Sequence, residues 1–194
     1  MSDTTDLDAR IAFLLEADGL KTVLRATRLV DGSRPENSAE HSWHLALAAL
    51  VLAPHAPSGV TIDRVVRMLL LHDLVEIDAG DMPFFADGDS AAQEAAENAA
   101  ADRLFAMLPG EQGTAFRALW DEFEAAESPD ARFAKALDRF QPPLLNLANG
   151  GGSWTEFAVT EEGIRARVAP KIARGAPALW TWLEPRIRAF FSAS

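Results

Sequence analysis

Apolar residues recur along most of the chain at the three- or four-residue spacing that places side chains on one face of an α-helix. No segment shows a convincing strand-like alternation of apolar and polar residues. The spacing predicts two short helices separated near Gly19, followed by longer helices over residues 38–53, 61–77, 90–107, 114–126 and 130–147. Two more helices are expected between about residues 160 and 192. The pattern therefore predicts an all-α fold built as a helical bundle.

Turn-forming residues separate these helices. Residues 31–37 are rich in Asp, Gly, Ser and Pro, and Asn37 or Ser38 is well suited to cap the next helix, because a short polar side chain accepts a hydrogen bond from the first turn. A loop is expected at residues 79–89, where Gly and Pro recur. Three consecutive glycines at residues 150–152 predict a flexible break before the C-terminal helices.

The bulk composition is that of a folded globular protein. The chain has 194 residues, of which 48% are hydrophobic and 24% charged, so we expect one domain over residues 1–194. The N-terminus is polar and acidic, unlike a signal peptide, and no apolar run approaches the ~20 residues that cross a bilayer. These features predict a cytoplasmic protein without a membrane partner.

Charge and cysteine content narrow the possible functions. The net charge of −11 argues against a polynucleotide partner, because there is no excess of Lys and Arg to neutralise a phosphate backbone. A small phosphorylated substrate remains compatible, since it needs only one or two local cations. The chain has no cysteine, so any metal site must use His, Asp and Glu.

The dipeptide His72-Asp73 is the most informative feature of the chain. It follows the apolar run at residues 65–71, and unpaired polar groups inside a core cost a few kcal/mol each. A cation bound by both side chains would remove that cost. Glu76 lies one helical turn further on the same face, where it can bond to a metal-bound water or protonate a leaving oxygen. Asp81, after a glycine-containing turn, can return a second carboxylate to the rim of the pocket.

Two further positions fit the same kind of site. His41 and Asp138 lie in helices of apolar periodicity, and two imidazoles with two carboxylates suit Mn²⁺, Co²⁺, Fe²⁺, Ni²⁺ or Zn²⁺. Other interpretations stay open at this point: His41 and His44 could form a ligand pair, and Asp138-Arg139 could be a surface charge pair. A di-iron carboxylate bundle is disfavoured, because the chain lacks the Glu-x-x-His pairs that it requires.

Four segments together resemble a known family. Residues 35–42, 71–76, 80–81 and 136–139 are similar, in order and context, to the HD-domain metal-dependent phosphohydrolase superfamily and, within it, to the compact 5′-deoxynucleotidase-like branch. The resemblance covers about residues 20–145, the motif-bearing core, with C-terminal helices at about 160–192. It implies one divalent metal ion, with Mg²⁺ added to the candidates above. The implied metal ligands are His41, His72, Asp73 and Asp138.

The resemblance also implies roles for residues around the metal. Asp73 and Glu76 would be catalytic, and Asp81 would contact the sugar hydroxyl of the substrate. An arginine upstream of the first ligand would hold the phosphate, and Arg25 is the best match, with Arg28 assisting. The chain departs from the deoxynucleotidases in having Ala26 directly after that arginine, where an aromatic residue often follows. Residues 141–154 also differ, and their glycine-rich segment either covers the pocket or only connects helices.

These features lead to one expected function and one alternative. We expect a hydrolase that cleaves the phosphomonoester of a small phosphorylated metabolite, such as a (deoxy)nucleoside 5′-monophosphate. A homodimer is expected, because compact members of the family are often dimeric and aromatic residues cluster near the C-terminus. The alternative is an HD-fold regulatory or ligand-binding protein that keeps the metal with little turnover. The presence of Glu76 and Asp81 disfavours it, since a purely structural site needs neither.

Overall fold

Helices make up nearly all of the regular structure in the computed structural model, which describes residues 3–83, 85 and 90–193. The prediction of an all-α fold is confirmed, and the described strands form only one small two-stranded sheet. Part of the loop expected at residues 79–89 lies outside the described residues. Among the described residues, none of the helices combines the length and apolar content needed to cross a membrane.

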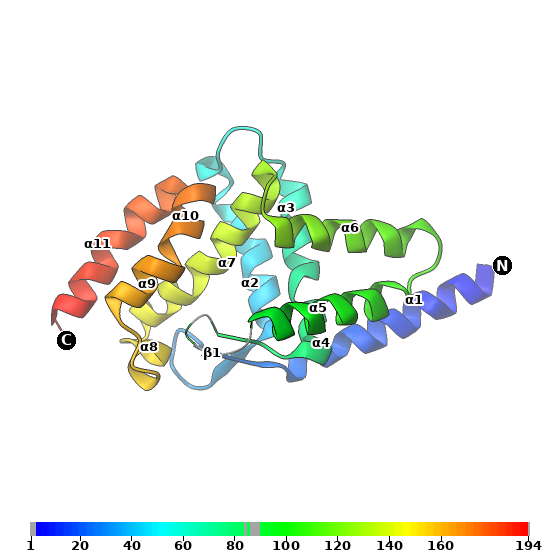
Figure 1. Cartoon of the computed structure of the whole chain (residues 1–194), viewed down its shortest axis with the longest axis horizontal. Coiled ribbons are helices and arrows are strands. Elements are labelled where there is room, and N and C mark those ends of the chain that lie inside the picture. The colour runs from blue at the N-terminus through cyan, green and yellow to red at the C-terminus, as the bar shows by residue number, and fades with distance from the viewer. Residues whose placement is uncertain (1–2, 84, 86–89, 194) are drawn as a thin grey trace.

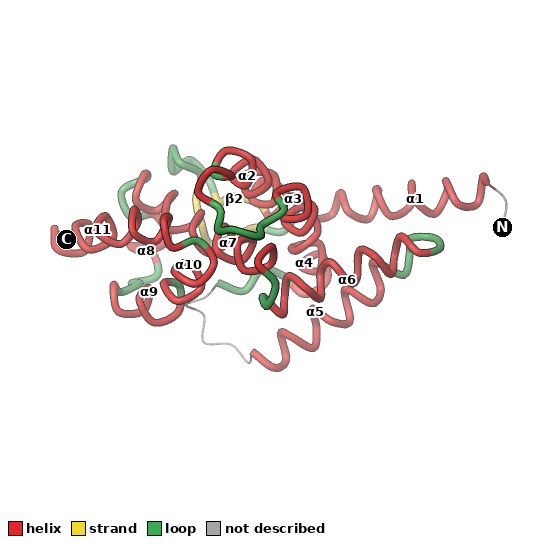
Figure 2. Tube along the Cα trace, turned by 90° about the horizontal axis from the view of Figure 1, so that it is seen from above, coloured by secondary structure: helices red, strands yellow, loops and turns green. Residues whose placement is uncertain are grey.

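The N-terminal segment contains the sheet. Helix α1 (Asp3–Ala17) leads through the 3₁₀ turn η1 (Asp18–Thr22) into strand β1 (Leu24–Arg28). This strand pairs with the antiparallel strand β2 (Pro35–Asn37). Figure 2 shows α1 extending away from the main body of the molecule.

The prediction of a second short helix after Gly19 is therefore wrong, because a 3₁₀ turn and a strand take its place. Leu24 is exposed and Thr27 is buried, so the polarity of a side chain does not predict its burial in this segment. Five residues are also too few to show an alternating pattern. The hairpin forms because residues 29–34 turn the chain back, with Leu29 N–H donating to the Arg34 carbonyl at 3.1 Å.

Helix α2 (Ser38–Val51) begins with a reciprocal cap. The Asn37 side chain accepts from the Glu40 N–H at 2.9 Å, and the Glu40 carboxylate accepts from the Asn37 N–H at 3.2 Å. After the short turn η2 (Ala53–His55), helix α3 (Ile62–Leu71) packs against α2.

The single helix predicted for residues 61–77 is divided in the structure. Helix α3 tightens into the 3₁₀ turn η3 (His72–Val75), which continues into α4 (Glu76–Ala79). Helix α2 packs against η3, and the Trp120 indole donates to the His72 carbonyl at 3.2 Å. The motif residues thus lie on a tightened turn in the interior.

The remaining helices agree with the predicted pattern up to residue 148. They are α5 (Ser90–Phe105), α6 (Glu111–Ala125), α7 (Pro129–Ala148), α8 (Gly152–Glu156), α9 (Glu161–Arg167), α10 (Ala169–Gly175) and α11 (Pro177–Ala193). The last three replace the two helices expected after residue 160. Figure 1 shows α7 running through the middle of the molecule, with α9, α10 and α11 on one side and α5, α6 and α1 on the other.

The glycine-rich segment forms a defined turn. Gly150, Gly151 and Gly152 all have positive φ angles, which residues with a Cβ rarely adopt. The Gly151 N–H donates to the Asn146 carbonyl at 2.7 Å, and the Ser153 hydroxyl donates to the Asn146 side chain at 3.1 Å. The predicted break between helices is present, and its backbone is held by these bonds.

The hydrophobic core consists of two clusters. One surrounds α7 and joins it to α2, α3, α10 and α11, with Leu45, Met68, Phe133, Leu137 and Ile172 among its members. The other joins α1, η3, α5 and α6. Helix α10 lies directly on α7: a Cβ at Gly175 would come within 1.9 Å of the Arg132 carbonyl oxygen.

Candidate metal centre

The structure gathers the predicted metal ligands from three elements. His41 comes from α2, His72 and Asp73 from η3, and Asp138 from α7. One ligand atom each from His41, His72 and Asp73 lies within 4.8 Å of the others. Asp138 Oδ1 lies 3.2 Å from His41 Nε2, so the fourth residue is placed beside this group.

Outer hydrogen bonds orient both imidazoles. His72 Nδ1 lies 2.9 Å from the Leu69 carbonyl and therefore donates to it. His41 Nδ1 lies 3.2 Å from Gln141 Oε1 and 3.3 Å from Glu36 Oε2, so it also carries its proton outwards. In the neutral rings that metal binding requires, the Nε2 atoms would then face the carboxylates with free lone pairs, as in metal-bound histidines.

One buried atom shows that the residues fit a cation. His72 Nε2 lies 2.9 Å from Asp73 Oδ1 but makes no hydrogen bond to any described residue. A lone pair facing a carboxylate inside a core is unfavourable, and a cation between the two atoms removes that cost. The two nitrogen and two oxygen donors suit a borderline divalent ion.

Strand β1 places Arg25 against the same group. Arg25 Nη1 lies 3.1 Å from Asp73 Oδ2, 3.3 Å from Asp81 Oδ1 and 3.6 Å from Glu76 Oε1. Arg25 Nε lies 4.0 Å from Glu36 Oε2. Only 10% of the Arg25 side chain is exposed, so one guanidinium offsets several carboxylates in a largely dry environment.

The surroundings shift the pKa values of the acids in this site in different directions. Burial, and then the charge of Asp73, raise the pKa of Glu76 to about 9, so this carboxyl keeps its proton at neutral pH. Burial also raises the pKa of Asp81. Burial opposes ionisation of Asp73 as well, but His72 and Arg25 hold its pKa below the usual range. The site therefore combines ionised carboxylates with a protonated acid.

The Asp138 carboxyl belongs to the ionised group. Burial acts to raise its pKa, but the charge of Arg139 and the contact with His41 hold the pKa well below its ordinary value. The pKa of His41 is itself raised: burial and Arg25 act against its charged form, but the bonds to Asp138 and Glu36 outweigh them. Proton and cation binding therefore compete for the same acceptor atoms.

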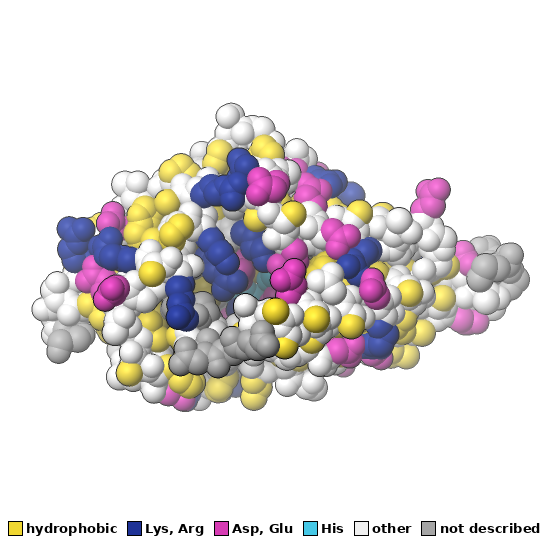
Figure 3. All heavy atoms as spheres, viewed as in Figure 1, with side chains coloured by type: hydrophobic (Ala, Val, Ile, Leu, Met, Phe, Trp, Pro, Cys, Tyr) yellow, Lys and Arg dark blue, Asp and Glu magenta, His cyan; other side chains and the backbone are white. Residues whose placement is uncertain are grey.

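A cavity of about 140 Å³ opens beside these residues. Arg25, Asp73, Glu76, Asp81 and Asp138 line it, together with Lys135 and Arg139 of α7. Figure 3 shows the hollow near the middle of this face, bordered by basic and acidic side chains.

Two sequence-proposed residues lie elsewhere. Arg28 turns away from the cavity lining, and its Nε lies 3.4 Å from Glu156 Oε2. His44 lies outside the group of His41, with its Nδ1 3.2 Å from Gln141 Nε2. The substrate-binding role assigned to Arg28 stays a prediction, and its position does not support it.

Sequence reasoning missed three residues that support the site. Glu36 and Gln141 hold His41, and the Ser38 hydroxyl donates to Glu76 Oε2 at 2.5 Å. Gln141 lies three positions after Asp138, so helical spacing could have placed it on the same face of α7. No sequence pattern indicated a role for Glu36, because its position beside His41 depends on the hairpin, which was not predicted.

Known proteins resemble this chain to different extents. A 5′-deoxynucleotidase from Xenopus laevis is 31% identical over 117 residues, 59% of this chain and 55% of that protein. The chain thus spans little more than half the length of this vertebrate relative. A 5′-deoxynucleotidase from Pasteurella multocida is 31% identical over 143 residues, 69% of this chain and 73% of that protein.

A solved structure and a family profile extend the likeness over most of the chain. The crystal structure of a predicted metal-dependent phosphohydrolase from Magnetospirillum magnetotacticum MS-1 superposes with a TM-score of 0.90 at 46% identity, covering 96% of this chain and 95% of that one. The profile of the HD domain matches residues 17–180. The matched range includes every residue of the centre described above, and the chain therefore belongs to the HD domain family.

Proposed function

We propose that the protein is a metal-dependent phosphomonoesterase of small phosphorylated metabolites, with deoxynucleoside 5′-monophosphates as the leading substrates. One observation carries this proposal: the unsatisfied Nε2 of His72 faces Asp73 in a pocket that also contains Arg25 and Glu76, whose pKa is raised by burial. These groups are suited to hold a metal cation, to bind a phosphate group and to give a proton. The names of the deoxynucleotidase relatives support the reaction class.

His41, His72, Asp73 and Asp138 would hold the metal. A divalent cation bound there polarises phosphoryl oxygens and increases the acidity of water. Arg25 would bind the substrate phosphate, for which its Nη1 must share its present contacts to Asp73 and Asp81. Since phosphoryl transfer depends mainly on positioning and electrostatics, this guanidinium would also offset charge that develops on the phosphoryl oxygens.

Glu76 would move the proton. The oxygen of a water molecule bonds to phosphorus, the ester P–O bond breaks, and the Glu76 carboxyl gives its proton to the departing alcohol oxygen. The proton released by the water then restores the Glu76 acid. The Ser38 hydroxyl fixes one carboxyl oxygen of Glu76 at 2.5 Å, which leaves Oε1 facing the pocket near Arg25. Asp81 would orient the sugar.

The test is phosphate release by purified protein with Mn²⁺, Co²⁺, Mg²⁺ or Zn²⁺ on deoxynucleoside 5′-monophosphates and sugar phosphates. We expect turnover with at least one metal, and a loss of roughly 100-fold or more in Asp73→Asn protein that stays folded by circular dichroism. Full activity in that variant contradicts the mechanism. Metal-dependent melting with no phosphate release across the whole panel supports the alternative, a binding protein.

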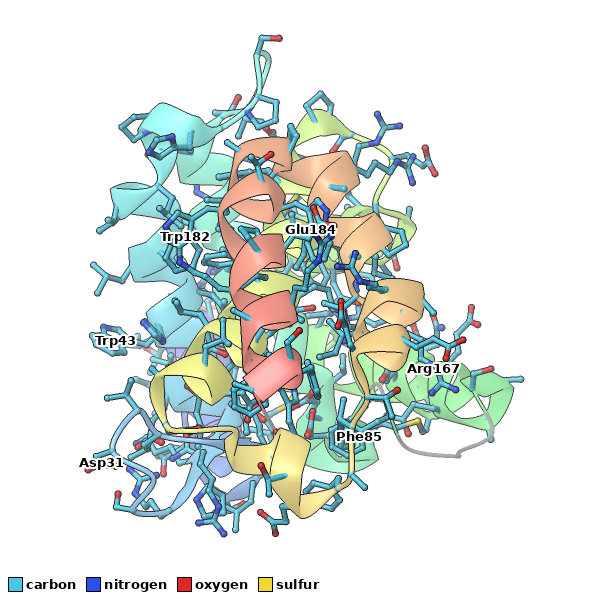
Figure 4. All side chains as sticks on the ribbon, turned by 90° about the vertical axis from the view of Figure 1, so that its left-hand side faces the viewer. Asp31, Trp43, Phe85, Arg167, Trp182 and Glu184 are labelled. Atoms are coloured by element: carbon cyan, nitrogen blue, oxygen red, sulfur yellow. The ribbon has the colours of Figure 1, made fainter. Side chains whose placement is uncertain are left out.

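We also propose a homodimer. Leu7, Leu14 and Leu15 of α1 are 58%, 63% and 72% exposed, and α1 extends from the body of the molecule. Trp43 of α2 is 62% exposed and points outwards (Figure 4). Exposed apolar side chains of this size are typical of surfaces that bind a partner. Light scattering should give the mass of two chains, and Leu14→Glu/Leu15→Glu protein should give one.

A further inference from the structure

A cluster of basic side chains extends from the pocket beside the metal centre to a second, neighbouring cavity. The chain has only three lysines, and two of them, Lys135 and Lys171, lie in this cluster together with Arg139. Lys135 and Arg139 are one turn apart on α7 and line the metal pocket. Lys171 belongs to α10, which packs along α7. It lines a second cavity of about 180 Å³ that shares Lys135 with the first.

The cluster holds more positive charge than its direct partners neutralise. Lys135 Nζ binds Glu124 at 2.9 Å and 3.0 Å. Two further arginines of the second cavity, Arg132 and Arg174, share Glu127 at 3.2 Å and 3.1 Å. These three cations therefore depend on two carboxylates.

Few carboxylates neutralise the positive charges of Arg139 and Lys171. Arg139 Nε is buried and lies 3.5 Å from Asp138 Oδ2, but it makes no hydrogen bond to a described residue. Asp138 is in turn shared with the metal centre. Lys171 is exposed, and its side chain makes no hydrogen bond or ion pair within the described part of the chain. The positive charge of Arg139, then burial, then the charge of Lys135 lower the pKa of Lys171.

An uncompensated basic cluster is unexpected in a protein with a net charge of −11. Neighbouring like charges repel one another, and a bound anion removes that repulsion. Guanidinium and ammonium groups are the usual partners of phosphate oxygens. Arg25, by contrast, already contacts Asp73, Glu76 and Asp81. The positive charge available for a further anion therefore lies on the wall formed by α7 and α10.

We propose that Arg139 and Lys171, with Lys135, form a second anion subsite that binds a phosphate group of the substrate other than the one that is cleaved. A small metabolite that carries a second phosphate group should then bind more tightly than the corresponding monophosphate. This inference rests on the proposed phosphomonoesterase function for the cleavage itself, but binding of the second phosphate requires only the basic wall.

The test compares deoxyadenosine 5′-monophosphate, deoxyadenosine 5′-diphosphate and deoxyadenosine 3′,5′-bisphosphate. Binding is measured by calorimetry at low salt in EDTA, which prevents metal-dependent turnover, and kcat/KM is measured with the activating metal. The diphosphate and the bisphosphate distinguish a second phosphate that is joined to the first from one that is placed elsewhere on the sugar.

The variants change the charge of Lys171, whose side chain is exposed. Lys171→Gln should weaken binding of the better two-phosphate compound about fivefold or more, while binding of the monophosphate changes less than about twofold. Lys171→Arg keeps the charge and should restore the preference. Lys21→Gln is the matched control: it removes the same charge from η1, where Lys21 pairs with Asp18 and lines neither cavity.

The outcomes separate the two proposals. Tighter binding of a two-phosphate compound that depends on Lys171, without phosphate release under any metal, supports the subsite and contradicts the proposed activity. Phosphate release with no preference for a second phosphate, or with Lys171→Gln indistinguishable from Lys21→Gln, overturns the subsite.

Discussion

At the scale of single residues, each imidazole of the centre has one ring nitrogen bound to an outer partner. Gln141 does this for His41: its Oε1 accepts from His41 Nδ1, and its Nε2 donates to Glu36 Oε1 at 2.8 Å. The Leu69 carbonyl has the same effect on His72. These outer bonds hold the ring orientations, so the inner nitrogens need only lose any bound proton to act as ligands.

Glu76 gives the clearest prediction at this scale. Its folded-state pKa of about 9 exceeds the ordinary value of 4.5, so the fold favours the protonated acid. Its contribution to the free energy of unfolding is therefore greatest below about pH 4.5 and is lost as the pH rises towards 9. Gln resembles the protonated acid, so in EDTA Glu76→Gln should melt higher than wild type at pH 8.5 and almost equally at pH 5. Each kcal/mol regained corresponds to roughly 2–4 °C in Tm.

Scanning calorimetry at the two pH values measures this difference. Glu184→Gln is a control for which the opposite change in Tm is expected. The bond to Arg165 lowers the pKa of Glu184, so removing the Glu184 carboxylate should slightly lower Tm at high pH. A change in Tm for Glu76→Gln that is the same at pH 5 and pH 8.5 would show that Glu76 is not held in its protonated form.

At the scale of elements, the sequence predicted the helices well and the hairpin not at all. Helix α7 is recognisable from residue 130 to 147 despite Pro142 and Pro143, because its apolar spacing continues through both prolines. Strand β1 has no such pattern, since its residues owe their burial to distant partners. The contact of Glu36 with Gln141 joins positions 105 residues apart, and no local rule encodes it. The candidate ligands could thus be named from the sequence, and their role stays a prediction, whereas the residues that support them could not be named.

The start of α2 gives a prediction at this scale. Asn37→Ala removes the side chain that caps α2, which should cost about 1 kcal/mol and lower Tm by roughly 2–4 °C. Thr61→Ala is the matched control, because Thr61 occupies the same position before α3 without forming a side-chain cap bond. Thermal melts of the two variants should therefore differ. Equal losses would indicate that the reciprocal bond with Glu40 does not stabilise α2.

At the scale of the whole molecule, the candidate centre joins parts of the chain that otherwise depend on separate cores. His41 and Asp138 belong to helices of the cluster around α7, whereas η3 also packs into the cluster with α5 and α6. A cation bound to all of them would link the two clusters. It would therefore stabilise the molecule as a whole, since it binds the folded chain only.

This link predicts a metal-dependent melting temperature. At a free metal concentration about 100 times the Kd, the folded state should gain roughly 2.7 kcal/mol, which raises Tm by several degrees relative to EDTA. The shift should disappear in Asp138→Asn protein and persist in His55→Gln protein, because His55 lies in η2 away from the centre. Tight metal binding without any rise in Tm would mean that the ion binds elsewhere or binds the unfolded chain equally well.

The contact of Gly175 with α7 has a consequence for how this protein can change through evolution. An added methyl group there would overlap the Arg132 carbonyl and Ala136, so any other residue would force the two helices apart. Lys171, four residues earlier on α10, would then move relative to Arg139. The separation of those two charges thus depends on one glycine, and a descendant that lost this glycine would change the phosphate spacing that the proposed subsite can accept.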